Sequence, residues 1–336
     1  MNPQKINVLV IGVGSIGERH VRNLLSLGAT VSIFDTEIIL KTEIAEKYAV
    51  QPLSSLDNTL KIFDLVLICT PTHTHVELAK KALNAGCHIF IEKPIAEKHS
   101  SELASLSQLA KMSEKIILVG CNMRFHRGVQ EIKNILDSNA LGKIYSVYAH
   151  CGHYLPNWRK TDYRNTYSAR AAQGGGIMLE CIHEFDYLRW LFGDILETSA
   201  RTVRSGALDI DGEDSAEITF LFKSGFLGHL HADYLQQTKR RGCEIVGENG
   251  TFIWESRGKN PEIATFTFLR KNGEPIEQKT VSVELDEMYL AEMRYLLEMI
   301  ENGTKTMNDV IQAAETLRLV ELAKESASKQ MNGLRR

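Results

Sequence analysis

The sequence predicts an α/β protein with an N-terminal doubly wound parallel sheet, followed by an α+β domain with a large, mostly antiparallel open sheet. Up to residue 121, short apolar strands alternate with helical segments, which is the pattern of a parallel sheet covered on both faces. Residues 195–284 have the pattern of consecutive strands separated by turn signals, which predicts antiparallel pairing. A glycine-rich turn joins the first strand to the first helix.

That glycine-rich turn has the pattern of a phosphate-binding site. Val8–Ile11 has the length and β-branched content of a buried strand, and Gly12, Gly14 and Gly17 follow it in G-x-G-x-x-G spacing. We expect Gly12 to permit the tight turn, Gly14 to let a pyrophosphate approach the backbone, and Gly17 to let the helix pack on the strand. Free N–H groups at the helix start attract phosphate oxygens.

An acidic residue follows the second strand. Val31–Phe34 ends at Asp35, at the distance from the glycines where a Rossmann fold places its ribose-binding carboxylate. The order of strand, turn, helix, strand and acid favours dinucleotide binding over the alternative, a plain glycine-rich turn. We expect NAD, with NADP less favoured, because Thr36 and Glu37 supply no arginine for a 2′-phosphate.

The composition excludes several classes of protein. The chain has 336 residues, 43% hydrophobic and 24% charged, so it is long enough for two globular domains. Its formal net charge of −3 offers no basic field for nucleic acid or an anionic membrane. No apolar run reaches the ~20 residues of a membrane span, and residues 1–5 leave no room for a signal peptide, so we expect a cytoplasmic protein.

Metal binding is not expected. The six cysteines are widely scattered without a C-x-x-C motif, which disfavours both a disulfide framework and a cysteine zinc site. His229 and His231 share one face of a predicted strand. We interpret them as sheet residues whose hydrogen bonds are made within the protein, rather than as a pair of zinc ligands.

The predicted domains follow from these patterns. We expect a Rossmann domain over residues 1–121, an α+β domain over 122–305, and a C-terminal helix over 306–330 that packs back on the N-terminal domain. Strands are predicted at 65–69, 88–91 and 116–119, and helices at 75–85, 103–113, 129–136, 177–191, 288–301 and 308–327.

Two loops are expected at the carboxyl edge of the parallel sheet, where such sheets bind ligands. The first, CTPTHTH, covers Cys69–His75. His73 and His75 could be metal ligands, but nothing nearby supplies a third ligand, so a loop that contacts the cofactor is preferred. The second contains Glu92, Lys93 and Pro94. Because Pro94 disfavours helix for Lys93, the lysine should project into the ligand crevice, although a solvated turn is the alternative.

A third candidate stretch is GGGIMLECIHEFDYLRWLFG, residues 174–193. Polar residues recur at helical spacing along this otherwise apolar helix, and a row of this kind is costly to bury without a purpose. The row consists of Glu180, His183, Asp186 and Tyr187. It predicts an acid–base site, and the alternative is a buried hydrogen-bond network that orients the helix. We interpret Cys181 as a small buried filler rather than a nucleophile.

At these stretches together the chain resembles the Gfo/Idh/MocA family of NAD(P)-dependent sugar dehydrogenases. The resemblance also includes VGCNMRFH at 119–126. It implies that Lys93 and His183 line the active site and that the second domain holds the substrate. It also implies that the open sheet face forms a homodimer or homotetramer. In the family an aspartate commonly precedes the histidine by four residues, whereas this chain has Leu179 there and Glu180 as the nearest carboxylate.

The stretch LPNWRKTDYRNTYSARAAQGGG, residues 155–176, looks like a subgroup often associated with bacterial surface-sugar pathways, including those of sialic-acid-like sugars. Its arginines and hydroxyl groups, Ser168 among them, suit a polar sugar, including an anionic one. The expected substrate-binding residues are Arg124, Trp158, Arg159, Tyr163, Arg164, Tyr167, Arg170 and His183.

The expected activity is NAD-dependent hydride transfer between nicotinamide and a secondary alcohol of a sugar, nucleotide sugar or cyclitol. His183 or Lys93 would move the hydroxyl proton, Lys93 would polarise the carbonyl, and Glu180 or Asp186 would orient the imidazole. Cofactor contacts are expected from Gly12, Gly14, Ser15, Ile16, Gly17, Asp35, Thr70, Pro71, Thr72, His75, Glu92, Lys93 and Asn122. The alternatives are reduction of a different carbonyl or imine, and a non-catalytic NAD(H)-binding regulatory protein.

Overall fold

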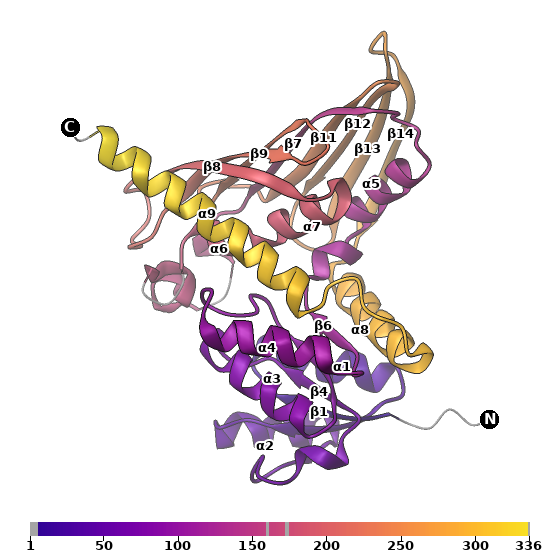
Figure 1. Ribbon diagram of the computed structural model, residues 1–336, viewed down its shortest axis with the longest axis vertical. Helices are drawn as coiled ribbons and strands as arrows, with labels where there is room; N and C mark the ends of the chain where they lie inside the picture. The colour runs from indigo at the N-terminus through magenta and orange to yellow at the C-terminus, as the bar shows by residue number, and fades with distance from the viewer. Residues whose placement is uncertain (1–5, 159–160, 172–174, 335–336) are drawn as a thin grey trace. The chain divides into compact units, whose positions relative to one another are not determined.

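The computed structural model describes residues 6–158, 161–171 and 175–334 (Figure 1). The chain divides into two compact units. The first contains the chain up to Asn122 together with Asp286–Leu317, and the second contains Met123–Leu285 together with the chain from Arg318. Among the described residues, none of the helices combines the length and the apolar character that a membrane crossing requires.

The first unit is built on a six-stranded sheet of order β3-β2-β1-β4-β5-β6, in which every pair is parallel. This is the doubly wound order, so the predicted Rossmann fold is confirmed. The strands are β1 (Asn7–Ile11), β2 (Thr30–Phe34), β3 (Gln51–Pro52), β4 (Leu65–Ile68), β5 (His88–Ile91) and β6 (Ile117–Val119). The helices are α1 (Ser15–Ser26), α2 (Ile38–Tyr48), α3 (His75–Asn84), α4 (Ser101–Met112) and, from Asp286 on, α8 (Leu285–Asn302).

The strand sequences explain the position of this sheet. All four residues of β4 are fully buried, as are Val8, Leu9 and Val10 of β1. Successive side chains of a strand point to opposite faces, so continuous apolar runs require cover on both faces. The helices between the strands supply that cover, and they leave the carboxyl ends of the strands for ligands.

Helix α8 groups with the first unit, whereas the sequence placed it in the domain over 122–305. The physical reason is packing, because Met293 and Leu296 are buried in the hydrophobic core of the parallel sheet. Asp286 adds ion pairs, at 3.0 Å to Arg19 Nε and 2.8 Å to an Arg22 nitrogen on α1.

The last helix, α9 (Val310–Leu334), is divided between the units. Its residues up to Leu317 group with the first unit and those from Arg318 with the second, which differs from a helix packed entirely on the N-terminal domain. Just before α9, the Asn308 carbonyl accepts a hydrogen bond from Val119 N, and Asn308 Nδ2 donates to Val119 O. Near its end, Ser326 Oγ accepts a hydrogen bond from Ala200 N. These contacts explain the division.

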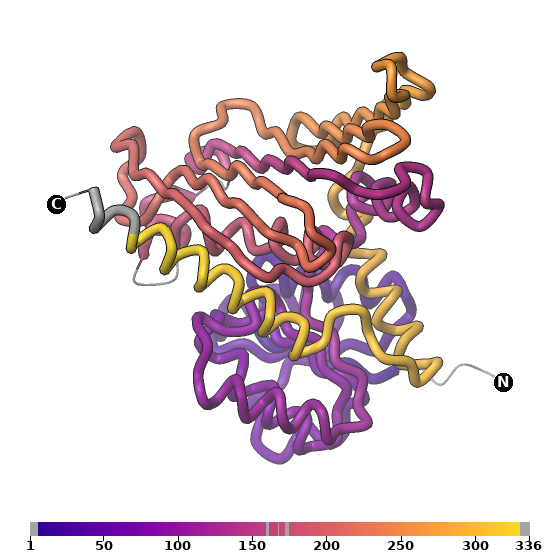
Figure 2. Tube along the Cα trace, turned by 45° about the horizontal axis from the view of Figure 1, so that its top comes forward, coloured from indigo at the N-terminus to yellow at the C-terminus, as the bar shows by residue number. Residues whose placement is uncertain are grey.

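The second unit contains an eight-stranded sheet of order β14-β13-β12-β11-β7-β10-β9-β8, antiparallel except where β10 pairs with β7. The predicted large, mostly antiparallel sheet is therefore confirmed. Its strands are β7 (Ile144–Gly152), β8 (Ile195–Val203), β9 (Ser215–Phe222), β10 (Leu227–Asp233), β11 (Arg240–Gly247), β12 (Gly250–Arg257), β13 (Glu262–Arg270) and β14 (Pro275–Val283). Figure 2 shows the turn between β13 and β14 extending beyond the neighbouring strands.

Strand β7 lies in the middle of this sheet, although the sequence indicated only a change of pattern at Ile144. Val147 and Ala149 are buried and Tyr148 between them is exposed, so the strand has one covered face and one open face. Helices α5 (Arg127–Asp137), α6 (Ile177–Glu180) and α7 (Ile182–Phe192) lie on one side of the sheet (Figure 1).

The open face carries a cluster of paired histidines. His229 Nε2 lies 3.0 Å from Glu217, and His231 Nδ1 lies 2.7 Å from the same carboxylate. His231 Nε2 also lies 3.0 Å from Asp233 Oδ2. The hydrogen bond with Asp233 raises the pKa of His231 to about 9; burial opposes this rise, and the hydrogen bond and charge of Glu217 add to it.

This pairing predicts a pH-dependent contribution to stability. Because folding raises this pKa, the charged imidazole stabilises the folded state fully below its ordinary pKa of about 6.5. The stabilisation is lost as the pH rises through about 9. We expect the melting temperature of His231→Gln to lie below that of the parent protein at about pH 6 and to equal it at about pH 10. Calorimetry at the two pH values checks this, and a difference independent of pH contradicts it.

Candidate active site

The glycine turn is shaped by close backbone contacts. A Cβ atom on Gly12, where φ is +85°, would lie 2.7 Å from the Cys69 carbonyl oxygen, and one on Gly17 would lie 1.9 Å from the Gly12 oxygen. Nothing lies within 4 Å of the equivalent position on Gly14. The first and third glycines are therefore required for packing, and the second leaves space in front of Ser15 and Ile16. This arrangement fits a pyrophosphate at the start of α1.

Asp35 is anchored to this turn. Its Oδ2 atom accepts a hydrogen bond from Val13 N at 2.8 Å, and its Oδ1 atom accepts one from Glu37 N at 2.9 Å. A carboxylate has about four acceptor sites, so both oxygens can accept further hydrogen bonds from hydroxyl groups. Two isoleucines that the sequence analysis did not single out, Ile38 and Ile39, follow directly, and each is 70% exposed.

The loop after β4 is connected to the loop after β5 by one imidazole. His75 is buried, with Nδ1 2.9 Å from the Pro94 carbonyl oxygen and Nε2 2.8 Å from the Thr70 carbonyl oxygen. Burial lowers the pKa of His75. The sequence predicted cofactor contacts from Thr70, Pro71, Thr72 and His75. Both ring nitrogens of His75 face backbone carbonyls, and a neutral imidazole has one N–H, so His75 lies between the two loops and donates to one of the two carbonyls.

Lys93 follows β5 at the carboxyl edge of the sheet, and Asn122 follows β6. The Lys93–Pro94 peptide bond is cis. Asn122 is buried, and its Oδ1 atom has no hydrogen-bond partner within the described part of the chain. A buried acceptor without a partner at this edge fits a ligand that brings a donor.

The helix predicted over 177–191 is divided in the structure. α6 ends at Glu180, Cys181 has ψ of 19°, and α7 begins at Ile182. The Cys181 thiol donates a hydrogen bond to the Met178 carbonyl at 3.4 Å, and burial raises the pKa of the thiol well above its ordinary value. These observations agree with a buried filler.

The start of α6 is capped by a distant acid. The Glu213 carbonyl accepts from Ile177 N at 3.1 Å, and its carboxylate accepts from Met178 N at 3.1 Å. A Cβ on Gly176 would lie 2.5 Å from the same carboxylate, so only glycine at this position leaves space for the Glu213 side chain. The helix that leads to His183 is thereby fixed at its first turn.

Two residues of the polar row on α6 and α7, Glu180 and Asp186, have different partners. Glu180 Oε1 accepts a hydrogen bond from Ser168 Oγ at 2.8 Å, and His183 is half-buried. Asp186 receives two hydrogen bonds from Arg124, Nε to Oδ2 at 2.7 Å and a terminal nitrogen to Oδ1 at 2.8 Å. The two side chains are only 3% and 1% exposed. The sequence predicted a catalytic Asp186 and a substrate-binding Arg124, and the structure brings these two residues together as a buried pair.

This geometry predicts that Asp186 contributes mainly to stability. Asp186→Asn should lower the free energy of unfolding by about 3 kcal/mol, because it leaves a buried guanidinium without its charge partner. Replacing both residues, Arg124→Met with Asp186→Leu, should recover most of that loss. Urea denaturation measures both variants.

The matched control is Asp194→Asn, because Asp194 is 63% exposed and pairs with Arg189 at 3.3 Å. It should cost less than about 1 kcal/mol. If Asp186→Asn instead lowered turnover with unchanged stability, Asp186 would have a direct catalytic role.

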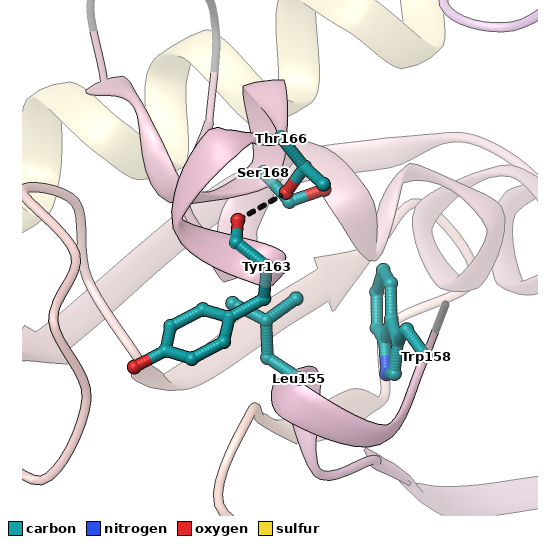
Figure 3. A pocket seen from close by; sticks show the side chains of 5 residues that line it. All are labelled: Leu155, Trp158, Tyr163, Thr166 and Ser168. Carbon is teal, nitrogen blue, oxygen red and sulfur yellow. Dashed lines mark hydrogen bonds between the residues drawn. The ribbon is translucent and has the colours of Figure 1, made fainter. Parts of the chain in front are cut away.

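Two of the predicted substrate residues line one pocket. Trp158 and Tyr163 line a small pocket that is open to solvent, together with Leu155, Thr166 and Ser168 (Figure 3). The Tyr163 hydroxyl accepts a hydrogen bond from Asp209 N at 3.1 Å.

Two of the predicted substrate arginines, Arg164 and Arg170, lie at exposed positions. Arg164 pairs with the exposed side chain of Asp162, and Arg170 is exposed. Arg159 and the side chain of Tyr167 lie outside the described residues.

A network of charged residues in the second unit was missed by sequence reasoning. Arg241 Nε lies 2.8 Å from Glu184, which follows His183, and Lys239 pairs with Glu262. His126 Nε2 lies 3.2 Å from Glu262. The sequence feature that could have indicated this network is the basic run 239–241 at the start of an apolar strand. Successive side chains of a strand point to opposite faces of the sheet, so Arg241 points to the covered face, while Arg240 pairs with Glu255 on the open face.

Cations from this network act on a histidine near the pocket. His153 and Trp158 have ring centroids 5.1 Å apart. Burial lowers the pKa of His153 to about 3, with further contributions from the charges of Lys239, Lys259 and Arg241.

Comparison with known proteins agrees with this architecture. Residues 6–121 match "Oxidoreductase family, NAD-binding Rossmann fold", and residues 129–253 match "GFO/IDH/MocA C-terminal domain". Inositol 2-dehydrogenase 3 of Saccharopolyspora erythraea is 29% identical over 261 residues, which cover 73% of this chain and 72% of that protein. The scyllo-inositol 2-dehydrogenase (NAD(+)) of Bacillus subtilis is 26% identical over 329 residues, 91% of this chain and 90% of that protein.

A solved structure shows the same fold. Levoglucosan dehydrogenase in complex with NADH and levoglucosan superposes with a TM-score of 0.83 at 19% sequence identity, covering 97% of this chain and 98% of that one. The two family matches account for both units in the order in which they occur along the chain. The chain belongs to the Gfo/Idh/MocA family of oxidoreductases, with an NAD(P)-binding Rossmann domain.

Proposed function

We propose that the protein transfers a hydride between nicotinamide and a secondary alcohol of a sugar, nucleotide sugar or cyclitol. The observation that carries the proposal is one sheet edge in the first unit, where the open position at Gly14, the anchored carboxylate of Asp35 and the strand-end Lys93 follow parallel strands. The names of the relatives, which include two inositol dehydrogenases and a levoglucosan dehydrogenase, support a cyclic polyol as substrate.

The residues of the first unit fit a dinucleotide. N–H groups at the start of α1 bind the pyrophosphate, and Asp35 accepts hydrogen bonds from both ribose hydroxyls. Ile38 and Ile39 offer an exposed apolar surface for a flat base beside Asp35. The unpaired Oδ1 atom of Asn122 accepts from an amide N–H of the ligand. When bound, the dinucleotide supplies the hydride chemistry.

The side chains of this chain supply the proton chemistry. Two arrangements of the proton chemistry are open. In the first, the Lys93 ammonium donates a hydrogen bond to the substrate oxygen and stabilises its developing negative charge while His183 takes the hydroxyl proton; in the second, Lys93 is the neutral amine and takes the proton itself. Of the two carboxylates predicted to orient His183, Glu180 is favoured, because both oxygens of Asp186 accept hydrogen bonds from Arg124. The pocket lined by Trp158 and Tyr163 holds the polar substrate.

We also propose that the protein is a homodimer or homotetramer formed through the open face of the eight-stranded sheet. Tyr148 and Ile263 are exposed there, and side chains of this size are costly to leave in water over a broad surface.

The test is a substrate panel. The purified protein is offered cyclitols, sugars and nucleotide sugars with NAD, and carbonyl and imine compounds with NADH, and reduction or oxidation of the cofactor is followed by absorbance. Turnover with a member of the panel supports the proposal. Tight binding of NAD(H) with no turnover supports the first alternative, a non-catalytic NAD(H)-binding regulatory protein. Turnover only with carbonyl or imine compounds that are not sugars supports the second alternative, a reductase of a different carbonyl or imine.

The first prediction from this proposal concerns the choice of cofactor. Asp35 should repel the 2′-phosphate of NADP, and its neighbours Thr36 and Glu37 carry no compensating positive charge. We expect NAD to bind at least about tenfold more tightly than NADP, and Asp35→Asn to reduce that ratio. Titration calorimetry measures both, and equal affinities would overturn the assignment of Asp35.

The second prediction concerns Lys93. Lys93→Met keeps most of the length of the side chain but removes the charge and all three donors, so turnover should fall roughly 10²- to 10³-fold. Affinity for NAD should be kept, because the glycine turn and Asp35 are untouched. The matched control is Lys98→Met at an exposed lysine nearby, which should leave turnover unchanged. A loss of less than about threefold in Lys93→Met would make Lys93 a solvated turn residue.

A further inference from the structure

The first unit contains a fully buried imidazole, that of His20. His20 lies on α1, one turn after Gly17, and its side chain is 0% exposed. Its ring packs edge-on against Phe90 of β5 at 5.0 Å and against Tyr289 of α8 at 6.2 Å. An imidazole in apolar surroundings is costly to bury unless a specific hydrogen bond compensates.

The compensating hydrogen bond goes to Glu92. His20 Nε2 lies 2.8 Å from Glu92 Oε1, and the other carboxylate oxygen accepts the backbone N–H of Lys93 at 3.1 Å. The Glu92 side chain is 16% exposed. Burial acts to raise the pKa of Glu92, but the hydrogen bond from His20, together with the charge of Lys93, keeps the pKa below its ordinary value.

The surroundings of the second ring nitrogen, Nδ1, decide which partner donates this hydrogen bond. His20 Nδ1 has no partner within the described residues, and a proton there would be a buried donor without an acceptor. We therefore assign the proton to Nε2, which donates to an ionised Glu92. The carboxylate then holds two donors at once, the imidazole of α1 and the backbone of Lys93.

Helix α8 keeps His20 in place from the other side. The Arg19 guanidinium lies 4.4 Å from the centre of the Tyr289 ring, and Arg19 Nε pairs with Asp286 at 3.0 Å. Burial raises the pKa of Tyr289, and the charge of Glu92 acts in the same direction, which places this phenol close to the carboxylate. The imidazole is thus enclosed by α1, β5 and α8.

We propose that His20 is a positioning residue that sets Lys93 relative to the glycine turn. The connection runs from α1 through His20 and Glu92 to the Lys93 backbone, while His75 Nδ1 lies 2.9 Å from the Pro94 carbonyl oxygen on the other side of the lysine. The helix whose start binds phosphate therefore also fixes the lysine that acts on the substrate. The role in turnover rests on the proposed function, whereas the structural connection does not.

The consequence concerns the Lys93 amide. Without the donor of His20, the Glu92 carboxylate can rotate toward water or the Lys93 ammonium, and the Lys93 N–H loses its acceptor. The lysine is then no longer confined to the orientation that catalysis requires, although the phosphate and ribose sites remain. Misplacement of a catalytic group lowers kcat more than it lowers affinity for the cofactor.

The experiment compares two side chains of matched length, His20→Met without a donor and His20→Gln with one. Hydrogen exchange of the Lys93 amide is measured by NMR in the full chain without cofactor. We expect exchange to accelerate at least about tenfold in His20→Met and to stay within about threefold of the parent in His20→Gln. Val21→Ala, at a neighbouring buried residue of α1, is the packing control and should leave this amide unchanged relative to the rest of β5.

Turnover is the second readout. With the substrate found in the panel, kcat of His20→Met should fall about tenfold while the dissociation constant of NAD changes less than about threefold. Adding Glu92→Gln to His20→Met should cost little more, because both changes interrupt one connection. Additive losses would show that His20 does not act through Glu92.

Each outcome decides one proposal. Unchanged exchange of the Lys93 amide in His20→Met overturns the positioning role, whatever the turnover. If His20→Met does not fold, Glu92→Ala approaches the connection from the other partner, and unchanged exchange there overturns it equally. Suppose that exchange of the Lys93 amide accelerates in His20→Met but the parent protein turns over no compound of the panel. That result supports the positioning role of His20 and counts only against the proposed function.

Discussion

The close approach of backbone at the end of β1 is the constraint on which the first unit depends. Gly12 contacts the strand end at Cys69, and Gly17 contacts Gly12, with no space for a Cβ atom at either position. This approach sets where α1 begins and in which direction its free N–H groups point. It also places the buried face of α1, with His20, against the end of β5. One steric requirement therefore shapes the phosphate site and the surroundings of Lys93.

The second unit is organised by a different constraint, the cost of burying charge. Arg124 with Asp186 and Arg241 with Glu184 are paired at 2.7 to 2.8 Å beneath the helices of the sheet. A buried charge destabilises the fold unless its partner is present, so these pairs hold α7 against β11, through Arg241, and against the segment before α5, through Arg124. The half-buried His183 lies on the same helix, so its position depends on these pairs.

Sequence reasoning succeeded where a function is encoded by local spacing. The fold class and the family are confirmed, because glycine spacing and apolar periodicity are properties of short segments. The candidate residues Asp35 and Lys93 could be placed because parallel strands present their carboxyl ends at one edge. The site residues themselves remain predictions, and Arg159 lies outside the described residues.

The sequence by itself determined the two-part architecture and the nucleotide-binding edge, since these depend on segments of a few residues. Only the tertiary structure decided which partners meet across long separations in the chain. His20 with Glu92, Arg124 with Asp186 and the grouping of α8 with the parallel sheet are of this kind. The physical reason is that a polar residue on an apolar helix face shows that a partner is needed, but only packing of the whole chain selects that partner.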